Sequence, residues 1–263
     1  MKLEFVKLSP TQNMTVIVKS PAPRNLHSDV AGRLIDYAGV FAEQAGFIEP
    51  PTLPGAKYRL QMMGGEFCGN ATMCLAALIA REEGLQAGEV RDVPVEISGA
   101  SGLLNCRVAG AEDGYLCRTS MPLPESVEIL NGYSLVRLPG ITHAILKCDD
   151  PGSLRAGAEE MLREIAELLD DEAVGLMLYS PQKAELLPLV YVKATDTMVW
   201  ERGCGSGSAA VGALAAWEAE KDVQISISQP GGTITANACW REGITEVSIE
   251  GKVKIVCEGI AYV

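Results

Sequence analysis

The sequence predicts an α+β fold of two pseudo-symmetric domains that arose by internal duplication. Two Cys-Gly runs, at Cys68 and Cys204, each open an apolar stretch with helical character, and they lie 136 residues apart. Shorter matches recur in the same order at an offset of 130 residues. These pairs are Val6-Lys7-Leu8 with Val136-Arg137-Leu138, and Ile97-Ser98-Gly99 with Ile227-Ser228-Gln229. Short strand patterns punctuated by glycine follow each helix, so each half is expected to be a curved antiparallel, β-barrel-like sheet around a central helix.

The elements of the first half follow from hydrophobic alternation and helical periodicity. Strands are expected at 3–8, 14–19, 57–63, 93–98, 103–108 and 114–120. One helix is expected at 28–44, and a second begins at Cys68. The first half therefore carries two helices among many short strands.

The second half repeats this order. Strands are expected at 133–138, 143–148, 189–199, 223–228, 233–238 and 245–250, with a final strand at 254–262. A helix at 153–170 has apolar residues at helical spacing, and another begins at Cys204. The Met121-Pro122-Leu123-Pro124 segment marks the expected boundary. This divides the chain into residues 1–122 and 123–253, with 254–263 a candidate to join the first half and the active site expected in the cleft between the halves.

Composition narrows the function classes. The 263 residues carry 22 Lys and Arg against 34 Asp and Glu, a net charge of −12, which argues against a nucleic-acid or anionic-membrane surface. No apolar run is long enough for a membrane helix, and the N-terminus has no signal-peptide pattern, so a cytoplasmic protein is expected. The eight cysteines include no CxxC pair and only two histidines accompany them, so neither a disulfide framework nor a structural zinc site is expected.

Cys68 and Cys204 differ from the other cysteines because each precedes a glycine at the expected N-terminus of an apolar helix. Backbone N–H groups without internal partners and the positive end of the macrodipole stabilise a thiolate there, which predicts a lowered thiol pKa. The same N–H groups bind carboxylates. Inversion at an amino-acid Cα needs a base on one face and an acid on the other, and a thiolate facing a thiol supplies both without pyridoxal phosphate or a metal.

Two runs resemble the active-site motifs of the diaminopimelate epimerase superfamily of cofactor-independent racemases and epimerases. They are Gly65-Glu66-Phe67-Cys68-Gly69-Asn70-Ala71-Thr72-Met73 and Trp200-Glu201-Arg202-Gly203-Cys204-Gly205-Ser206-Gly207. The resemblance spans nearly the whole chain. It implies two pseudo-symmetric domains, Cys68 and Cys204 as the acid/base pair, no cofactor, a small amino-acid substrate, and a homodimer as the candidate assembly.

A closer resemblance is to the histidine racemases that feed staphylopine-type metallophore synthesis. The shared runs are Ser9-Pro10-Thr11-Gln12-Asn13-Met14-Thr15, Glu43-Gln44-Ala45-Gly46-Phe47-Ile48-Glu49, the two cysteine runs, and Gln229-Pro230-Gly231-Gly232. Diaminopimelate epimerases hold the far end of their substrate with asparagines whose positions here fall on Gly140-Ile141-Thr142-His143, Arg59 and Glu172-Ala173-Val174-Gly175. That loss argues against diaminopimelate. Arg202, where the histidine racemases have asparagine, leaves the side-chain specificity open.

The resemblance and the residue types together select the remaining candidates for substrate binding. They are Asn13, Gly69, Asn70, Glu201, Arg202, Gly205 and Ser206, with Glu43, Glu49 and Glu66 as weaker candidates. Each has a structural alternative: Asn13 as a turn residue, Asn70 and Ser206 as helix caps, and the glutamates as surface charges. His143 and Cys74 are expected to be structural.

The favoured function is therefore a cofactor-independent histidine racemase that uses two cysteines. A diaminopimelate epimerase or a racemase of another polar amino acid is the alternative within the same class. A binding or redox protein that does not turn over its ligand is the alternative from another class. The PhzF-like isomerases of the same fold are disfavoured because they use a glutamate in place of paired cysteines.

Overall fold

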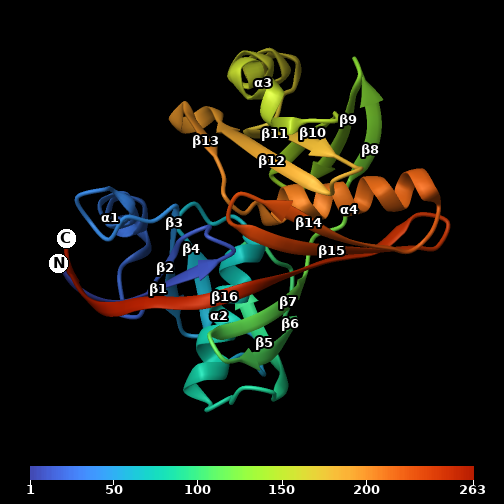
Figure 1. The fold of residues 1–263 in the computed structure, drawn as a ribbon. Coiled ribbons are helices and arrows are strands. Elements are labelled where there is room, and N and C mark those ends of the chain that lie inside the picture. The colour runs from blue at the N-terminus through green and yellow to red at the C-terminus, as the bar shows by residue number, and fades with distance from the viewer. The chain divides into compact units, whose positions relative to one another are not determined.

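A computed structural model describes all residues, 1–263, and the chain forms two compact units. Unit 1 comprises Met1–Ser120 together with Glu250–Val263, and unit 2 comprises Met121–Ile249 (Figure 1). The α+β class expected from the sequence is confirmed.

Unit 1 is built on seven strands and the C-terminal part of an eighth. The strands are β1 (Lys2–Pro10), β2 (Thr15–Val18), β3 (Gln44–Glu49), β4 (Arg59–Met62), β5 (Val90–Ile97), β6 (Leu104–Ala111), β7 (Gly114–Ser120) and, from Glu250 on, β16 (Ile244–Tyr262). Each strand neighbours the next from β1 to β7, and β16 lies beside both β7 and β1, so the sheet returns to its first strand. Lys2 pairs with Tyr262 in this last step.

Helix α2 (Gly69–Glu82) is the central helix of unit 1, and strands β1, β2, β5, β6 and β7 all contact it. Twelve of its residues, Gly69–Ala80, are buried, as expected for a helix of small and apolar residues on every face. The helix ends where Gly84 takes a positive φ of 76° and Leu85 N–H bonds to the Ala80 carbonyl at 2.9 Å. Helix α1 (His27–Ile35) buries one stripe, including Val30 and Leu34, against β3.

Unit 2 repeats the order of unit 1. Its strands are β8 (Ser126–Leu130), β9 (Tyr133–Leu138), β10 (Ile141–Lys147), β11 (Ala173–Ser180), β12 (Glu185–Val192), β13 (Thr197–Trp200), β14 (Val223–Gln229), β15 (Gly232–Trp240) and the first part of β16. Helix α3 (Ala158–Leu168) lies between β10 and β11 in the chain, as α1 lies between β2 and β3. Helix α4 (Gly205–Ala219) precedes β14 and contacts β9, β10, β14 and β15, so it is the counterpart of α2.

The sheets are mixed, which differs from the expected antiparallel arrangement. Most neighbours are antiparallel, but β2–β3 and β4–β5 in unit 1 are parallel, as are β10–β11 and β12–β14 in unit 2. Each parallel pair is joined through a helix, because a parallel connection must cross back over the sheet.

Several element boundaries were wrong. The expected helix at 28–44 stops at Ile35, where a turn begins in which the Asp36 side chain accepts a hydrogen bond from Ala38 N–H at 2.8 Å, and residues 44–49 form β3. The expected strand at 189–199 is broken by a short 3-10 helix at Lys193–Thr195, after which Asp196 adopts a left-handed φ of 49°. The expected strands at 245–250 and 254–262 are one continuous strand, β16.

Candidate active site

Cys68 is the N-cap of α2. Its backbone is extended, with φ −137° and ψ 112°, and its Sγ accepts a hydrogen bond from Ala71 N–H at 3.4 Å. Thr72 Oγ1 donates to the Cys68 carbonyl at 2.8 Å, so the residue is held at both its sulfur and its backbone. The residue is half-buried.

A glutamine from β3 bonds to the Cys68 sulfur. Cys68 Sγ lies 3.0 Å from Gln44 Oε1 and donates to it. Gln44 Nε2 donates in turn to Asn13 Oδ1 at 2.7 Å and to Thr15 Oγ1 at 2.8 Å. Asn13, a predicted site residue, is buried and is thereby linked to Cys68 through a single side chain.

Cys204 is the N-cap of α4 and repeats the geometry of Cys68. Its Sγ accepts from Gly207 N–H at 3.2 Å, and Ser208 Oγ donates to its carbonyl at 2.7 Å. Gln229, at the end of β14, forms two hydrogen bonds to the start of α4. Its Oε1 accepts from the Cys204 N–H at 2.8 Å, and its Nε2 donates to Ser208 Oγ at 2.7 Å. Cys204 is only 1% exposed, so it is more enclosed than Cys68.

Gly207 explains why a glycine stands in the first turn of α4. A Cβ at this position would lie 2.4 Å from Met177 Sδ and 3.0 Å from Cys204 Sγ. The first separation is shorter than real Cβ contacts and the second is tighter than most, so a larger residue here would require Met177 to move.

A buried polar chain leads away from Cys204. Cys204 Sγ and Ser206 Oγ are 3.6 Å apart, and Ser206 Oγ lies 2.9 Å from His143 Nε2. His143 is fully buried on β10, and its Nδ1 has no hydrogen-bond partner. Burial lowers the pKa of His143 to about 3, so the imidazole is neutral at physiological pH.

The expected lowering of the thiol pKa does not hold for Cys204. Burial raises its pKa well above the ordinary value, and the Glu201 carboxylate beside it raises it further. Hydrogen bonds from Gly207 and Ser206 act in the opposite direction but are outweighed. Burial also raises the pKa of Glu201, and its hydrogen bond with Cys204 acts in the opposite direction.

The other predicted residues on the two helices lie in their first turns. Gly69, Asn70 and Gly205 are buried there, and Ser206 is half-buried. Arg202 is exposed and donates from its guanidinium to the Pro230 carbonyl at 3.2 Å. Cys74 is fully buried on α2, as expected of a core residue.

The three weaker candidates lie in different surroundings. Glu66 is exposed in the loop before Cys68, and its carbonyl accepts from Ser98 Oγ at 2.8 Å. Glu43 is exposed next to Gln44, immediately before β3. Glu49, at the far end of β3, pairs with Arg24 at 2.5 Å and with Arg59 at 3.5 Å. Its carboxylate is therefore already neutralised by protein.

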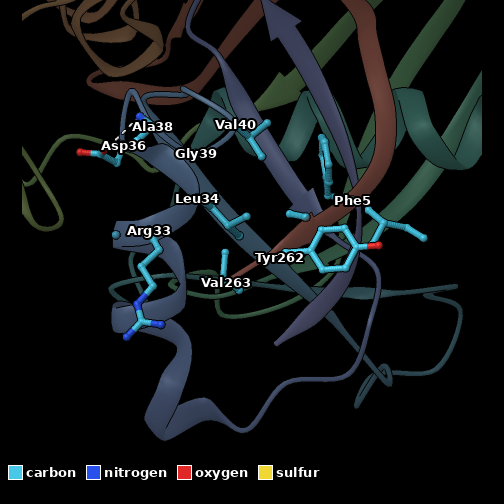
Figure 2. A pocket seen from close by; sticks show the side chains of 12 residues that line it. Phe5, Arg33, Leu34, Asp36, Ala38, Gly39, Val40, Tyr262 and Val263 are labelled. Atoms are coloured by element: carbon cyan, nitrogen blue, oxygen red, sulfur yellow. Dashed lines mark hydrogen bonds between the residues drawn. The ribbon is translucent and has the colours of Figure 1, made fainter.

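Unit 1 contains a cavity of about 860 Å³, and neither Cys68 nor Cys204 lines it (Figure 2). Phe5, Arg33, Leu34, Val40 and Tyr262 are among the residues that line it, and none of the predicted site residues does. No group of three or more His, Cys, Asp or Glu side chains is arranged to hold a metal ion. No helix combines the length and the apolar character needed to cross a bilayer.

The repeated fold and its two N-capping cysteines define the class of protein: an amino-acid racemase or epimerase with the diaminopimelate epimerase-like fold. The family model described as "Histidine racemase CntK N-terminal domain" matches residues 2–262. The chain therefore belongs to the histidine racemase family.

Individual relatives agree with this assignment. A histidine racemase of Staphylococcus aureus (strain Mu50 / ATCC 700699) is 30% identical over 276 residues, which covers 99% of this chain and 98% of the relative. A diaminopimelate epimerase of Acidiphilium cryptum (strain JF-5) is 29% identical over 281 residues, covering 97% and 95%. The crystal structure of a Bacillus anthracis phenazine biosynthesis protein of the PhzF family superposes with a TM-score of 0.72 at 14% identity over the full length of both chains, which shows a shared fold.

Three side chains that reach the cysteines directly or through one neighbour were not predicted as site residues. Gln44 bonds to Cys68, Gln229 bonds to Cys204, and His143 bonds to Ser206. Gln44 and Gln229 do lie in runs that resemble the histidine racemases, and that resemblance was the sequence signal that could have marked them as site residues.

Proposed function

We propose that this protein interconverts L- and D-histidine at the α carbon without a cofactor, with Cys68 and Cys204 acting on opposite faces of the substrate. The observation that carries the proposal is the pair of N-capping cysteines, one on each equivalent helix, in a chain that matches the histidine racemase family over residues 2–262. The S. aureus relative named as a histidine racemase supports the choice of substrate.

The chemistry needs one proton removed and one returned. In the proposed reaction one sulfur, as thiolate, takes the Cα proton, and the other, as thiol, gives its proton to the opposite face of the carbanion. The sulfurs finish with exchanged protonation states, and the reverse reaction restores them. In this proposal the substrate carboxylate, on which negative charge accumulates, binds backbone N–H groups in the first turns of the helices, at Gly69 and Asn70 and at Gly205 and Ser206.

The pairing of Cys204 with Glu201 supports a route for ionising a buried thiol. Burial raises the pKa of Cys204 and the neighbouring Glu201 carboxylate raises it further, and both effects disfavour the thiolate. The raised pKa of Glu201 makes its carboxylate a better proton acceptor than an ordinary glutamate. A proton moving from the thiol to Glu201 leaves the net charge of the buried pair unchanged, so it avoids adding a second charge.

The surroundings of Arg59 favour histidine over diaminopimelate. Its guanidinium pairs with buried Glu96 at 2.7 Å and also contacts Gln61 at 3.2 Å. These contacts occupy a position where diaminopimelate epimerases place an asparagine for the far end of the substrate. None of the eight cysteines forms a disulfide, and a thiol-dependent enzyme is expected in a reducing compartment such as the cytoplasm.

The test is loss of the Cα proton signal by NMR when reduced protein is incubated in D2O with single amino acids. L-histidine should exchange and its optical rotation should decay to zero, while diaminopimelate and other polar amino acids should not exchange. Exchange of diaminopimelate alone would retain the thiol chemistry and reject the substrate. No exchange with any amino acid would reject the reaction.

Serine variants test the two sulfurs separately. Cys68→Ser and Cys204→Ser should each abolish exchange, because each face needs its own group. Cys257→Ser is the matched control, since Cys257 is exposed on β16 and should be dispensable. Full activity in either single variant would contradict the two-thiol mechanism.

A further inference from the structure

The hydrogen bonds around Gln44 determine which end of its amide faces Cys68. Thr15 Oγ1 carries one proton, and it donates that proton to the Asn13 carbonyl at 3.2 Å. Thr15 Oγ1 can therefore only accept from Gln44, at 2.8 Å, so the atom of Gln44 that faces it is the NH2 group. The second amide proton goes to Asn13 Oδ1 at 2.7 Å. Both donors of Gln44 are used, and its oxygen is the atom that remains for Cys68.

This orientation acts on the protonation state of the sulfur. An amide oxygen only accepts hydrogen bonds, so at 3.0 Å from Sγ it is satisfied by a thiol S–H and opposed by a thiolate. The N–H of Ala71, at 3.4 Å, favours the thiolate, as any helix N-terminus does. Gln44 therefore favours the thiol form of Cys68, whereas the N-terminus of α2 favours the thiolate.

Cys204 has a different kind of acceptor beside its sulfur, the Glu201 carboxylate, which can itself take up a proton. The Ser206 hydroxyl, 3.6 Å from the same sulfur, can donate or accept. A hydroxyl can therefore follow the sulfur through both protonation states, whereas the locked amide at Cys68 prefers one.

We infer that Gln44 is a positioning residue that holds Cys68 as the protonated thiol in the substrate-free protein. If the proposed function holds and Cys204 passes its proton to Glu201, Cys68 is the acid in the first turnover, and the substrate enantiomer whose Cα proton faces Cys204 reacts first. The protonated state of Cys68 follows from the contacts among Asn13, Thr15, Gln44 and Cys68, whether or not histidine is the substrate.

The experiment measures the titration of Cys68 in the full-length protein. Iodoacetamide alkylation is followed at each cysteine by peptide mass spectrometry across pH 6–10, and the midpoint gives the apparent thiol pKa. Exposed Cys257 is an internal reference in every sample. Gln44→Ala admits water, which can donate to a thiolate, so the Cys68 midpoint should fall by about 0.5–1 pH unit, a roughly three- to tenfold rise in thiolate at neutral pH.

Two Thr15 variants test whether Thr15 fixes the orientation of the Gln44 amide, and both leave Gln44 itself in place. Thr15→Val keeps the shape but removes the acceptor, so the amide is free to turn and the Cys68 midpoint should fall. Thr15→Ser keeps the oxygen and should retain the wild-type midpoint. Gln61→Ala, whose amide contacts Arg59 and the Met62 carbonyl, is the matched glutamine control and should also leave it unchanged.

An unchanged Cys68 midpoint in Gln44→Ala would overturn the inference, and so would equal midpoints in Thr15→Val and Thr15→Ser. The alkylation assay does not depend on turnover. If the wild-type protein fails to exchange histidine while the midpoints shift as expected, the proposed function fails and the role of Gln44 stands.

Discussion

Replacing Gln229 with alanine should destabilise unit 2 through the backbone of Cys204. Gln229 is 6% exposed, and its oxygen accepts the Cys204 N–H at 2.8 Å. In Gln229→Ala that buried N–H loses this acceptor at the start of α4. A buried donor left without a partner costs about 1–3 kcal/mol.

The second bond of the amide adds to this loss. Gln229 Nε2 donates to Ser208 Oγ at 2.7 Å, but Ser208 Oγ keeps its own bond to the Cys204 carbonyl, also at 2.7 Å. Loss of the bond between Gln229 Nε2 and Ser208 Oγ therefore costs as much as an ordinary hydrogen bond, about 1 kcal/mol. Together the two bonds predict a decrease of about 2–4 kcal/mol in the free energy of unfolding.

Urea denaturation followed by tryptophan fluorescence measures this change directly. All three tryptophans, Trp200, Trp217 and Trp240, lie in unit 2, so the signal reports on the unit that contains Gln229. Gln224→Ala on the same strand is the matched control, because Gln224 is exposed and bonds to Asn237 at the surface. It should change the free energy by less than about 0.5 kcal/mol. Equal midpoints and slopes for the two variants would contradict a stabilising role for the two hydrogen bonds of Gln229.

Three further outcomes are expected. Gly207→Ala should lower the unfolding temperature, because its Cβ would lie 2.4 Å from Met177 Sδ, whereas Gly32→Ala, where no atom lies within 4 Å, should not; equal shifts would contradict this. Burial raises the pKa of Glu96, but hydrogen bonds from Thr52, Arg59 and the backbone outweigh it and set the pKa at about 2. Its stabilising effect is therefore complete above the unfolded pKa and is lost as pH falls toward 2, so the thermal destabilisation by Glu96→Gln should shrink between pH 6 and pH 2, and a constant difference would argue against it. In a His27→Gln variant, the remaining imidazole C–H signals, those of His143, should keep their neutral NMR shifts from pH 8 to pH 5, and a midpoint near pH 6.5 would show that the ring is not buried as described.

The helices that carry the cysteines were predictable because their signals are local. A cysteine, a glycine and then a run of small apolar residues define both the start of α2 and its burial on all sides, and α4 repeats the pattern. The internal match between halves added the equivalence of the two cysteines. None of this required knowledge of distant contacts.

The boundary errors have a common physical origin. Val40 and Ala42 continue the helical periodicity of α1, but the turn at Asp36 ends the helix before them. Strand β11 was missed because seven of its eight residues, Val174–Ser180, are buried, so the alternation that marks a half-exposed strand is absent. Parallel strands buried on both faces give only an apolar run.

The partners of the cysteines were out of reach for a different reason. Gln44 lies 24 residues before Cys68 and Gln229 lies 25 residues after Cys204. Only the pairing of strands brings these amides to the helix ends, and nothing in the residue type distinguishes them from surface glutamines. His143 was expected to be structural, and its bond to Ser206 could not be anticipated because it depends on where β10 passes α4.

Because Lys2 pairs with Tyr262, the sheet of unit 1 can be completed only after β16 has been synthesised. Strand β1 is made first, yet its partner in β16 spans residues 253–262 at the other end of the chain. At about 5–20 residues per second, that edge of β1 waits roughly 10–50 s on the ribosome before its partner emerges. An unpaired strand edge invites pairing with another chain, and Lys2, Glu4 and Lys7 place a charge at intervals along β1. Charges at such intervals along an open edge disfavour pairing with another chain, so we expect them to protect β1 during this interval.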